Sequence, residues 1–252
     1  MIEDLFQVDE LQQLCGYGLK ICDGLEIRQP ILSDIVSLGE LEYFSMIFML
    51  TAIPSDMIAQ LDKMGLCWEN VEDFELFCMM APTIPLKSTR VLFGPELDFG
   101  EFEIKPLESG ARGCYLEHRT LGVRIDELRY QAISKYLCGL HGIKKQRRVA
   151  GNDLTRKVMI EMAHEDLEMM KRKRVHEKST LRPLISTMVN MPGFKYNLKE
   201  VLSIGYAQFM DAVRRMQIIT STQALLNGCY SGNIDTKKLN KDELNFMRDV
   251  GK

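Results

Sequence analysis

The stretch YFSMIFMLTAI, residues 43–53, is the most apolar run of the chain. The run lies at the end of a predicted helix. Pro30 precedes this helix, Ser33 can cap it, and it extends to about Ala52. The segment YFSMIFML is apolar on nearly every side of such a helix, and a surface helix would have a polar face. The run is also far shorter than the roughly 20 residues that cross a bilayer. The sequence therefore predicts a buried helix within a globular protein.

Length and composition agree with that interpretation. The chain has 252 residues, 46% hydrophobic and 27% charged, which is enough apolar material for one large domain or two small ones. The first residues, MIEDLFQVDELQQLC, are acidic and lack the basic and apolar regions of a signal peptide. The seven cysteines are irregularly spaced, so we expect reduced thiols in a cytosolic protein.

Turn residues divide the first half of the chain into short elements. Glycine-spaced runs over 15–29 predict a small hairpin. Two short helices are expected, one over about 54–65 and one that begins at Asn70 and stops before Pro82. Residues 83–124 contain β-leaning pieces, VLFG, FEIKPL, CYLEH and LGVRI, which predict a small antiparallel sheet or an irregular insert.

Helical spacing returns after this β-leaning segment. Asp126 can cap a helix that Gly142 ends, and Gly228 is expected to end the longest one. Helices are predicted at about 127–140, 154–174, 180–190, 198–226 and 240–248. The expected fold is mainly α with a small β portion (α+β). We expect an acidic, mostly helical segment over residues 1–82, a β-leaning insert over 83–124 and a helical segment over 125–252, or one continuous domain built from all three.

No sequence motif indicates catalysis or a cofactor. The chain contains no GxxxxGK[ST] and no G-x-S-x-G, and Gly16-Tyr17-Gly18 lacks the third glycine of a dinucleotide-binding turn. Cysteine pairs at C-x₂-C spacing and histidine pairs at i, i+4 are missing too. His164 and its acidic neighbours on one helix fit a solvated charged face better than a metal site. We therefore predict no catalytic, cofactor-binding or metal-binding residues.

Charge is unevenly distributed along the chain. Residues 1–80 hold 15 acidic and 3 basic side chains, whereas residues 141–182 hold 12 basic and 6 acidic ones. The basic side chains form two groups, one at 144–148 and one made of Lys171, Arg172, Lys173 and Arg174. The second group is the predicted charged contact. It could meet an acidic protein surface, including this chain's own first third, or simply complement a helix dipole; stacking aromatics for nucleic acid are missing nearby.

The corner Met191-Pro192-Gly193 stops one helix and is followed at once by two aromatics, where a surface turn would be polar. The long helix after it has an apolar stripe. The predicted protein-binding residues are the corner aromatics Phe194 and Tyr196 and the stripe residues Tyr206, Phe209, Met210, Val213 and Met216. The alternative is that these side chains are core residues.

Two stretches carry a family resemblance. One is IRQPILSDIVSLGELEYFSMIFMLTAIPSDMIAQLDKMG, residues 27–65. The other begins LRPLISTMVNMPGFKYNL, passes through FMDAVRRMQ and ends LLNGCYSGNIDTKKLNKDELNFM, residues 181–247. Together they resemble tail morphogenesis proteins of tailed bacteriophages of Gram-positive hosts, of the tail assembly chaperone or baseplate-hub-associated type.

The resemblance implies a non-enzymatic protein. A tail assembly chaperone shields apolar helices, typically of the tape-measure protein, and its partners would be such tail proteins or a second copy of itself. It would act in the host cell cytoplasm and be absent from the finished particle. The alternative is a structural virion protein of the tail, such as a baseplate, hub or connector subunit. Neither role requires nucleic acid, membrane or cofactor. The 16 methionines suit an adaptable apolar surface, but core packing is the better explanation for most of them.

Overall fold

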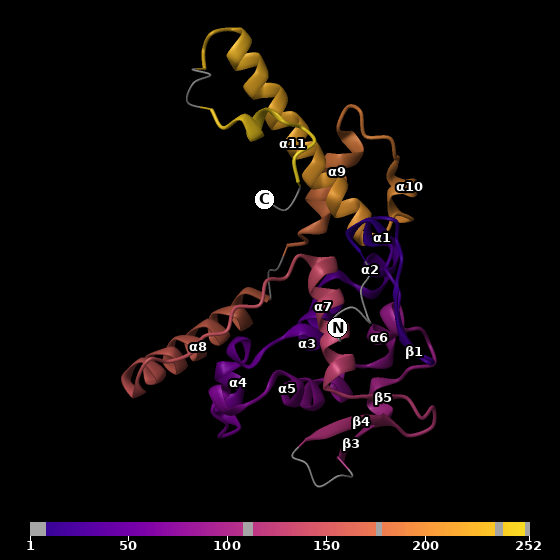
Figure 1. The fold of residues 1–252 in the computed structure, drawn as a ribbon, viewed down its shortest axis with the longest axis vertical. Coiled ribbons are helices and arrows are strands. Elements are labelled where there is room, and N and C mark those ends of the chain that lie inside the picture. Colours follow the sequence, from indigo (N-terminus) through magenta and orange to yellow (C-terminus); the bar gives the residue numbers. More distant parts are fainter. Residues whose placement is uncertain (1–8, 108–112, 175–177, 235–238, 250–252) are drawn as a thin grey trace.

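A computed structural model describes residues 9–107, 113–174, 178–234 and 239–249, with side chains omitted at 173 and 174. Helices account for 60% of the chain and the strands form two small antiparallel sheets, so the predicted mainly α fold with a small β portion is confirmed. Figure 1 shows a compact lower body from which α8 and α11 project. The helices of the first half are α1 Glu10–Leu14, α2 Leu32–Leu38, α3 Glu40–Thr51, α4 Ile58–Lys63, α5 Asp73–Met80 and α6 Leu86–Phe93. Those of the second half are α7 Glu127–His141, α8 Asp153–Arg174, α9 Leu181–Asn190, α10 Leu198–Leu202 and α11 Tyr206–Tyr230.

Helix α3 lies at the centre of the main core, as its apolar sequence predicted. Its buried side chains are Tyr43, Met46, Ile47, Leu50 and Thr51. It packs against α2, α5, α6 and α7, so one continuous core joins residues from Leu19 to Val213. All three predicted segments of the chain contribute to that core.

The helix predicted from Ser33 to about Ala52 is two helices. Gly39 separates α2 from α3 with φ +100° and ψ 129°, a conformation that glycine adopts readily because it has no Cβ. The predicted cap is also wrong. The cap is Ile31, two residues before Ser33, and the Asp34 carboxylate accepts a 3.2 Å hydrogen bond from the backbone N–H of Ile31. A carboxylate in the first turn satisfies an N–H that Ser33 cannot reach from inside the helix.

The two sheets are small and lie at separate places. Strands β1 (Leu19–Cys22) and β2 (Leu25–Ile27) form the predicted hairpin, and β3 (Phe102–Pro106), β4 (Cys114–His118) and β5 (Arg124–Ile125) form a three-stranded antiparallel sheet in sequence order. The prediction that VLFG is a β piece is wrong, because Val91–Phe93 is the last turn of α6 and Gly94 ends the helix with φ +85°. Leu92 is fully buried there and Phe93 nearly so, which shows that tertiary packing outweighs β propensity.

Helix α8 projects from the body and rests on α4 (Figure 1). A second, smaller apolar cluster joins the two. Trp68, Ile58 and Leu61 are buried in it, and Met159 and Ile160 of α8 pack against it. Other apolar side chains of α8 are exposed: Leu154, Val158, Met162 and Met169.

The helix predicted over 198–226 is also two helices. Between α10 and α11 the backbone crosses residues 30–32: Tyr206 N–H donates to the Pro30 carbonyl at 2.9 Å, and Leu32 N–H donates to the Ile204 carbonyl at 3.0 Å. These hydrogen bonds fix the start of α11 to the start of α2. Helix α11 then runs through Gly228, which was predicted to end it, as far as Tyr230.

Two other predicted boundaries differ from the structure. Asn70 ends a 3₁₀ helix, Trp68–Asn70, and α5 begins three residues after Asn70, behind Glu72. In place of the helix predicted over 240–248, a 3₁₀ helix spans Lys241–Leu244. The segment after it lies against α11, where Arg215 donates to the carbonyls of Phe246 and Arg248 at 3.0 and 2.8 Å.

Candidate binding groove

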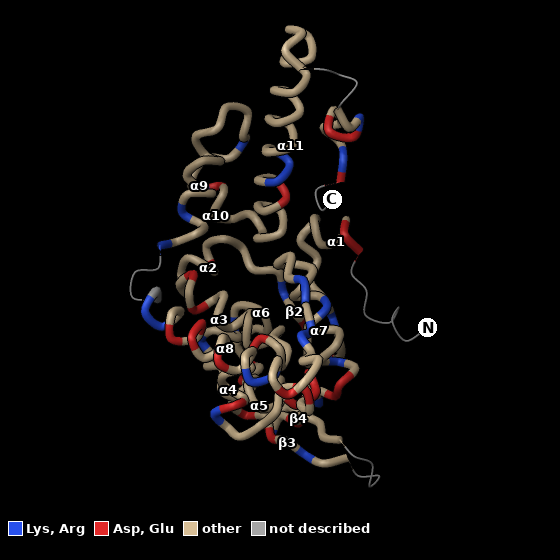
Figure 2. The backbone as a smooth tube through the Cα atoms, turned by 90° about the vertical axis from the view of Figure 1, so that its left-hand side faces the viewer, with Lys and Arg blue, Asp and Glu red and all other residues tan. Residues whose placement is uncertain are grey.

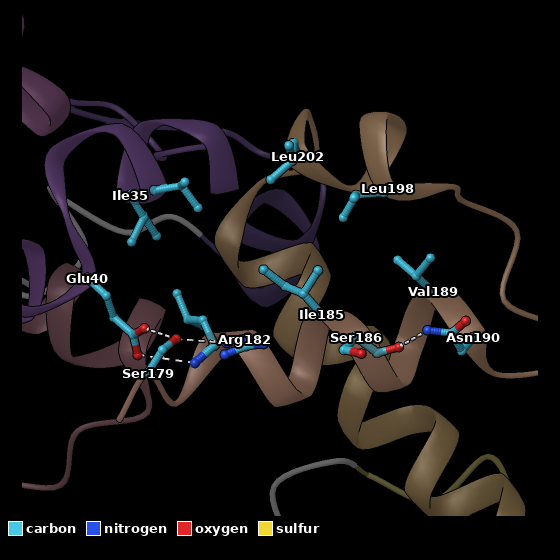
Figure 3. Close-up of a pocket in the computed structure, with 12 residues that line it drawn as sticks. Ile35, Glu40, Ser179, Arg182, Ile185, Ser186, Val189, Asn190, Leu198 and Leu202 are labelled. Atoms are coloured by element: carbon cyan, nitrogen blue, oxygen red, sulfur yellow. Dashed lines mark hydrogen bonds between the residues drawn. The ribbon is translucent and has the colours of Figure 1, made fainter. Parts of the chain in front are cut away.

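An apolar groove lies between α2, α9 and α10, with a cavity volume of about 570 Å³ (Figure 3). Its apolar lining comes from Ile35 and Val36 of α2, from Leu181, Ile185 and Val189 of α9, and from Leu198 and Leu202 of α10. Val36 and Leu198 are 57% and 56% exposed, so the groove presents large aliphatic side chains to solvent. Such a concave apolar surface between helices is a typical place for a partner helix to bind.

Glu40 fixes one end of the groove by holding the start of α9. Its carboxylate accepts hydrogen bonds from the backbone N–H groups of Thr180 and Leu181, at 2.8 and 3.1 Å, and from the hydroxyls of Ser179 and Thr180. These backbone donors are among the N–H groups that a helix start leaves without partners. Burial raises the pKa of Glu40, but the hydrogen bonds outweigh it and the net pKa lies below the ordinary value. Glu40 is therefore an anionic cap that ties α9 to α3.

The Met-Pro-Gly corner fixes the other end by turning the chain from α9 into α10. Gly193 has φ +91°, and Phe194 N–H closes the turn on the Met191 carbonyl at 3.2 Å. Asn197 then caps α10, accepting from the N–H groups of Lys199 and Glu200 at 2.9 and 3.1 Å. The corner therefore positions α10 beside α9.

The two aromatics of the corner lie edge to face, with ring centroids 5.5 Å apart and planes at 62°. Phe194 is partly buried and packs against the main core, whereas Tyr196 is 46% exposed. Neither lines the groove. Phe194 thus anchors the corner, and only Tyr196 offers an aromatic face to a partner.

The predicted protein-binding stripe on α11 is mostly core. Phe209 is fully buried, Tyr206 and Val213 are each 6% exposed, and Met210 and Met216 are partly buried against the same core. The expectation that Tyr206, Phe209 and Val213 form an exposed surface is wrong for this fold, because α11 lays that stripe on α7 and on the end of α1. The groove on α9 was missed. Its sequence signal is the helical spacing of Leu181, Ile185 and Val189.

The acidic first third and the basic segment of the chain contact each other through ion pairs. Figure 2 colours the acidic residues red and the basic residues blue along the backbone. Ion pairs join Arg147 to Asp73 at 3.0 Å and Arg156 to Glu69 at 2.8 Å, and His164 bonds Asp62 at 2.8 Å. The loop before α8 is held as well, since Trp68 Nε1 donates to the Arg148 carbonyl at 3.0 Å and Ala150 N–H donates to Glu69 at 2.7 Å. Some of the charge asymmetry thus forms an intramolecular interface, one of the alternatives that the sequence left open.

The predicted charged contact lies at the far end of α8. Lys171 pairs with Glu168 on its own helix at 2.6 Å, and Arg172 is exposed. The side chains of Lys173 and Arg174 lie outside the described residues. Because the ion pair of Lys171 stays within α8, the role of this cluster as a contact with another surface stays a prediction.

A second cavity, of about 350 Å³, lies between α5 and α7, and most of its lining residues are charged or polar. The Tyr130 and Ser134 hydroxyls are buried in its lining. Acidic and basic lining residues are equal in number: Glu72, Asp73, Glu127, Lys135, Lys145 and Arg147. Since its charges balance, this cavity indicates no class of ligand.

Metal-binding clusters and membrane-crossing helices are both missing from the part of the chain that the structure describes. Those residues contain no group of three or more histidine, cysteine or acidic side chains placed to hold a metal ion. None of their helices is long and apolar enough to cross a membrane. Comparison with protein-family models, with curated proteins and with solved structures gives no match to this chain.

Proposed function

We propose that this chain is a non-enzymatic tail morphogenesis protein of a tailed bacteriophage, acting as a tail assembly chaperone that shields apolar helices of a tail protein such as the tape measure. The proposal joins the resemblance of residues 27–65 and 181–247 to one structural observation, the groove between α2, α9 and α10. Most of the groove's lining residues fall within those two stretches. The proposed binding site therefore lies mostly within the two stretches that carry the resemblance.

The groove has the properties that shielding requires. A client helix would bury its apolar stripe against Ile185, Val189 and Leu198, and burying apolar surface contributes roughly 25 cal/mol per Å². Association costs several kcal/mol in lost translational and rotational freedom, so a groove of this size favours weak, reversible binding. Reversibility is what a chaperone needs, because the client must leave when the tail tube polymerises around it.

A solution assay with the apolar helical segment of the phage's own tape-measure protein tests the proposal. We expect the purified chain to suppress light scattering by that segment in a concentration-dependent way. Leu198→Asp places a charge on an exposed side chain of the groove and should abolish suppression, because an unpaired charge against an apolar face is costly. Gln223→Asp, exposed on the projecting half of α11, is the matched control and should behave as wild type. Equal suppression by all three proteins would refute a role for the groove.

A structural virion protein is the second candidate, and the shape of the chain favours it. Helices α8 and α11 extend from the body in different directions (Figure 1), and α8 exposes apolar side chains along its length. Projecting elements of this kind suit interfaces between subunits. The exposed residues on α8 are Leu154, Val158, Met162, Met169 and Met170.

Mass spectrometry of purified particles beside the infected-cell lysate separates the two candidates. A chaperone is expected to be abundant in the lysate and absent from the particle. Presence in the particle at a stoichiometric level would instead establish a structural tail protein. The comparison needs no assumption about which surface binds.

A further inference from the structure

The groove differs in character between its two ends, and this inference rests on the proposed function of the groove. Glu40, Ser179 and Arg182 lie at the end where α9 begins, and Asn190 lies at the other end (Figure 3). Between them the face of α9 that lines the groove is Ile185, Ser186 and Val189. A partner that fits must therefore be apolar in the middle, and at one end it must interact favourably with a charged side chain of the groove.

At the end where α9 begins, Arg182 is the charged residue whose side chain can contact a partner. Its side chain is exposed and makes no ion pair or hydrogen bond among the described residues. Glu40 forms no ion pair with it, because the Glu40 carboxylate accepts from Ser179, Thr180 and Leu181 instead. The start of α9 offsets part of the Glu40 charge, since helix N-termini carry partial positive charge.

The length of the groove limits the size of its occupant. From Arg182 to Asn190 the axis of α9 rises about 12 Å, at 1.5 Å per residue. A helix lying along that length has about two turns, and two turns place three apolar side chains on one face, at i, i+3 or i+4, and i+7.

We propose that the groove takes a two-turn amphipathic client helix that carries an aspartate or glutamate beside the first or last residue of its apolar stripe, where the carboxylate meets the Arg182 guanidinium. The apolar stripe lies on Ile185, Val189 and Leu198. The carboxylate sets which end of the client faces the start of α9. Arginine suits this role because its planar fork can bind both oxygens of a carboxylate.

Three fluorescent helical peptides test the proposal with the full chain. They share the same apolar stripe and differ at one flanking position, which is Glu, Gln or Lys. Wild type should bind the Glu peptide about two- to five-fold more tightly than the Gln peptide, the range of a partly exposed ion pair, and the Lys peptide most weakly. The Glu preference should shrink as salt is raised from about 0.05 M to about 0.5 M, since the screening length falls from roughly 14 Å to roughly 4 Å.

Charge reversal at the groove provides the second arm. In Arg182→Glu the order of the three peptides should reverse, whereas Lys199→Glu should keep the wild-type order. Lys199 is exposed on α10 and does not line the groove, which makes it the matched control. Both variants change an exposed side chain and should keep the wild-type circular dichroism.

The outcomes separate this inference from the proposed function. If the three peptides bind wild type equally well and Leu198→Asp abolishes binding of all three, the groove binds apolar helices but the role of Arg182 is refuted. If none of the peptides binds, or if Leu198→Asp leaves binding unchanged, the proposed function of the groove fails as well. An unchanged order in Arg182→Glu also overturns the inference.

Discussion

The Tyr43 hydroxyl and the His141 ring form a 2.7 Å hydrogen bond that joins α3 to the end of α7. His141 Nδ1 donates to the Leu137 carbonyl at 2.8 Å, so Nε2 carries the lone pair that accepts from Tyr43. Tyr206 stacks on the same imidazole with ring centroids 5.0 Å apart. The neutral histidine therefore connects α3 and α7 to the first residue of α11.

This arrangement predicts a pH dependence of stability. Burial lowers the pKa of His141 to about 4, and the ordinary value that it regains on unfolding is 6.5. Between these values the unfolded chain binds a proton that the folded chain does not, so stability is lost as pH falls from about 6.5 toward 4. One such group changes the free energy of unfolding by at most about 1.4 kcal/mol per pH unit. The free energy of unfolding, measured with urea between pH 7.5 and 4.5, should fall less steeply with decreasing pH in His141→Gln than in wild type. An equal pH dependence in the two proteins would contradict the assignment.

Removing the Tyr43 hydroxyl should destabilise the fold at neutral pH. Tyr43→Phe keeps the ring in the core but leaves His141 Nε2 without its donor, which costs about 1 to 3 kcal/mol. Urea unfolding at pH 7.5 measures the loss. Tyr196→Phe, on a half-exposed ring, is the control and should change the free energy of unfolding by less than about 0.5 kcal/mol. An equal effect of the two substitutions would count against the importance of the buried bond.

Phe209→Asp should unfold the chain rather than abolish partner binding alone. Phe209 is fully buried, so the substitution removes a core aromatic and buries an unpaired carboxylate, and the two effects together exceed about 4 kcal/mol. Circular dichroism and thermal unfolding would report the loss. Gln217→Asp, exposed on the same helix, should stay folded. A folded Phe209→Asp chain that has lost only its partner would restore the interpretation of this stripe as a binding surface.

Glu40→Ala should increase local unfolding of α9 and have a smaller effect on the free energy of global unfolding. The substitution removes the acceptor of the Thr180 and Leu181 N–H groups, and losing a helix cap costs about 0.5 to 2 kcal/mol. Hydrogen exchange should accelerate over residues 181–190 while α3 and α7 stay protected. Glu96→Ala, at an exposed residue outside the groove, should leave exchange in α9 unchanged. Uniform acceleration in both variants would mean that Glu40 does not hold the groove together.

Local rules in the sequence determined the class of the fold and many of its elements. The apolar run 43–53 required burial, Asp126 and Gly142 marked the ends of α7, and the β-leaning pieces over 102–125 became the second sheet. Each of these predictions depends on neighbours within a few residues: the periodicity of apolar side chains, a capping side chain, a glycine with positive φ.

Tertiary structure decided which apolar faces are buried and which stay exposed. The stripe through Phe209 lies in the core, whereas Ile185 and Val189 of α9 pack at the edge of that core and also line the groove. Spacing shows that a face is apolar, but a partner within the chain has to be present to cover it. The Glu40 cap on α9 and the contact of Gly205 with residues 30–32 join segments more than 130 residues apart. No local rule reaches that far, because such contacts depend on how the whole chain packs.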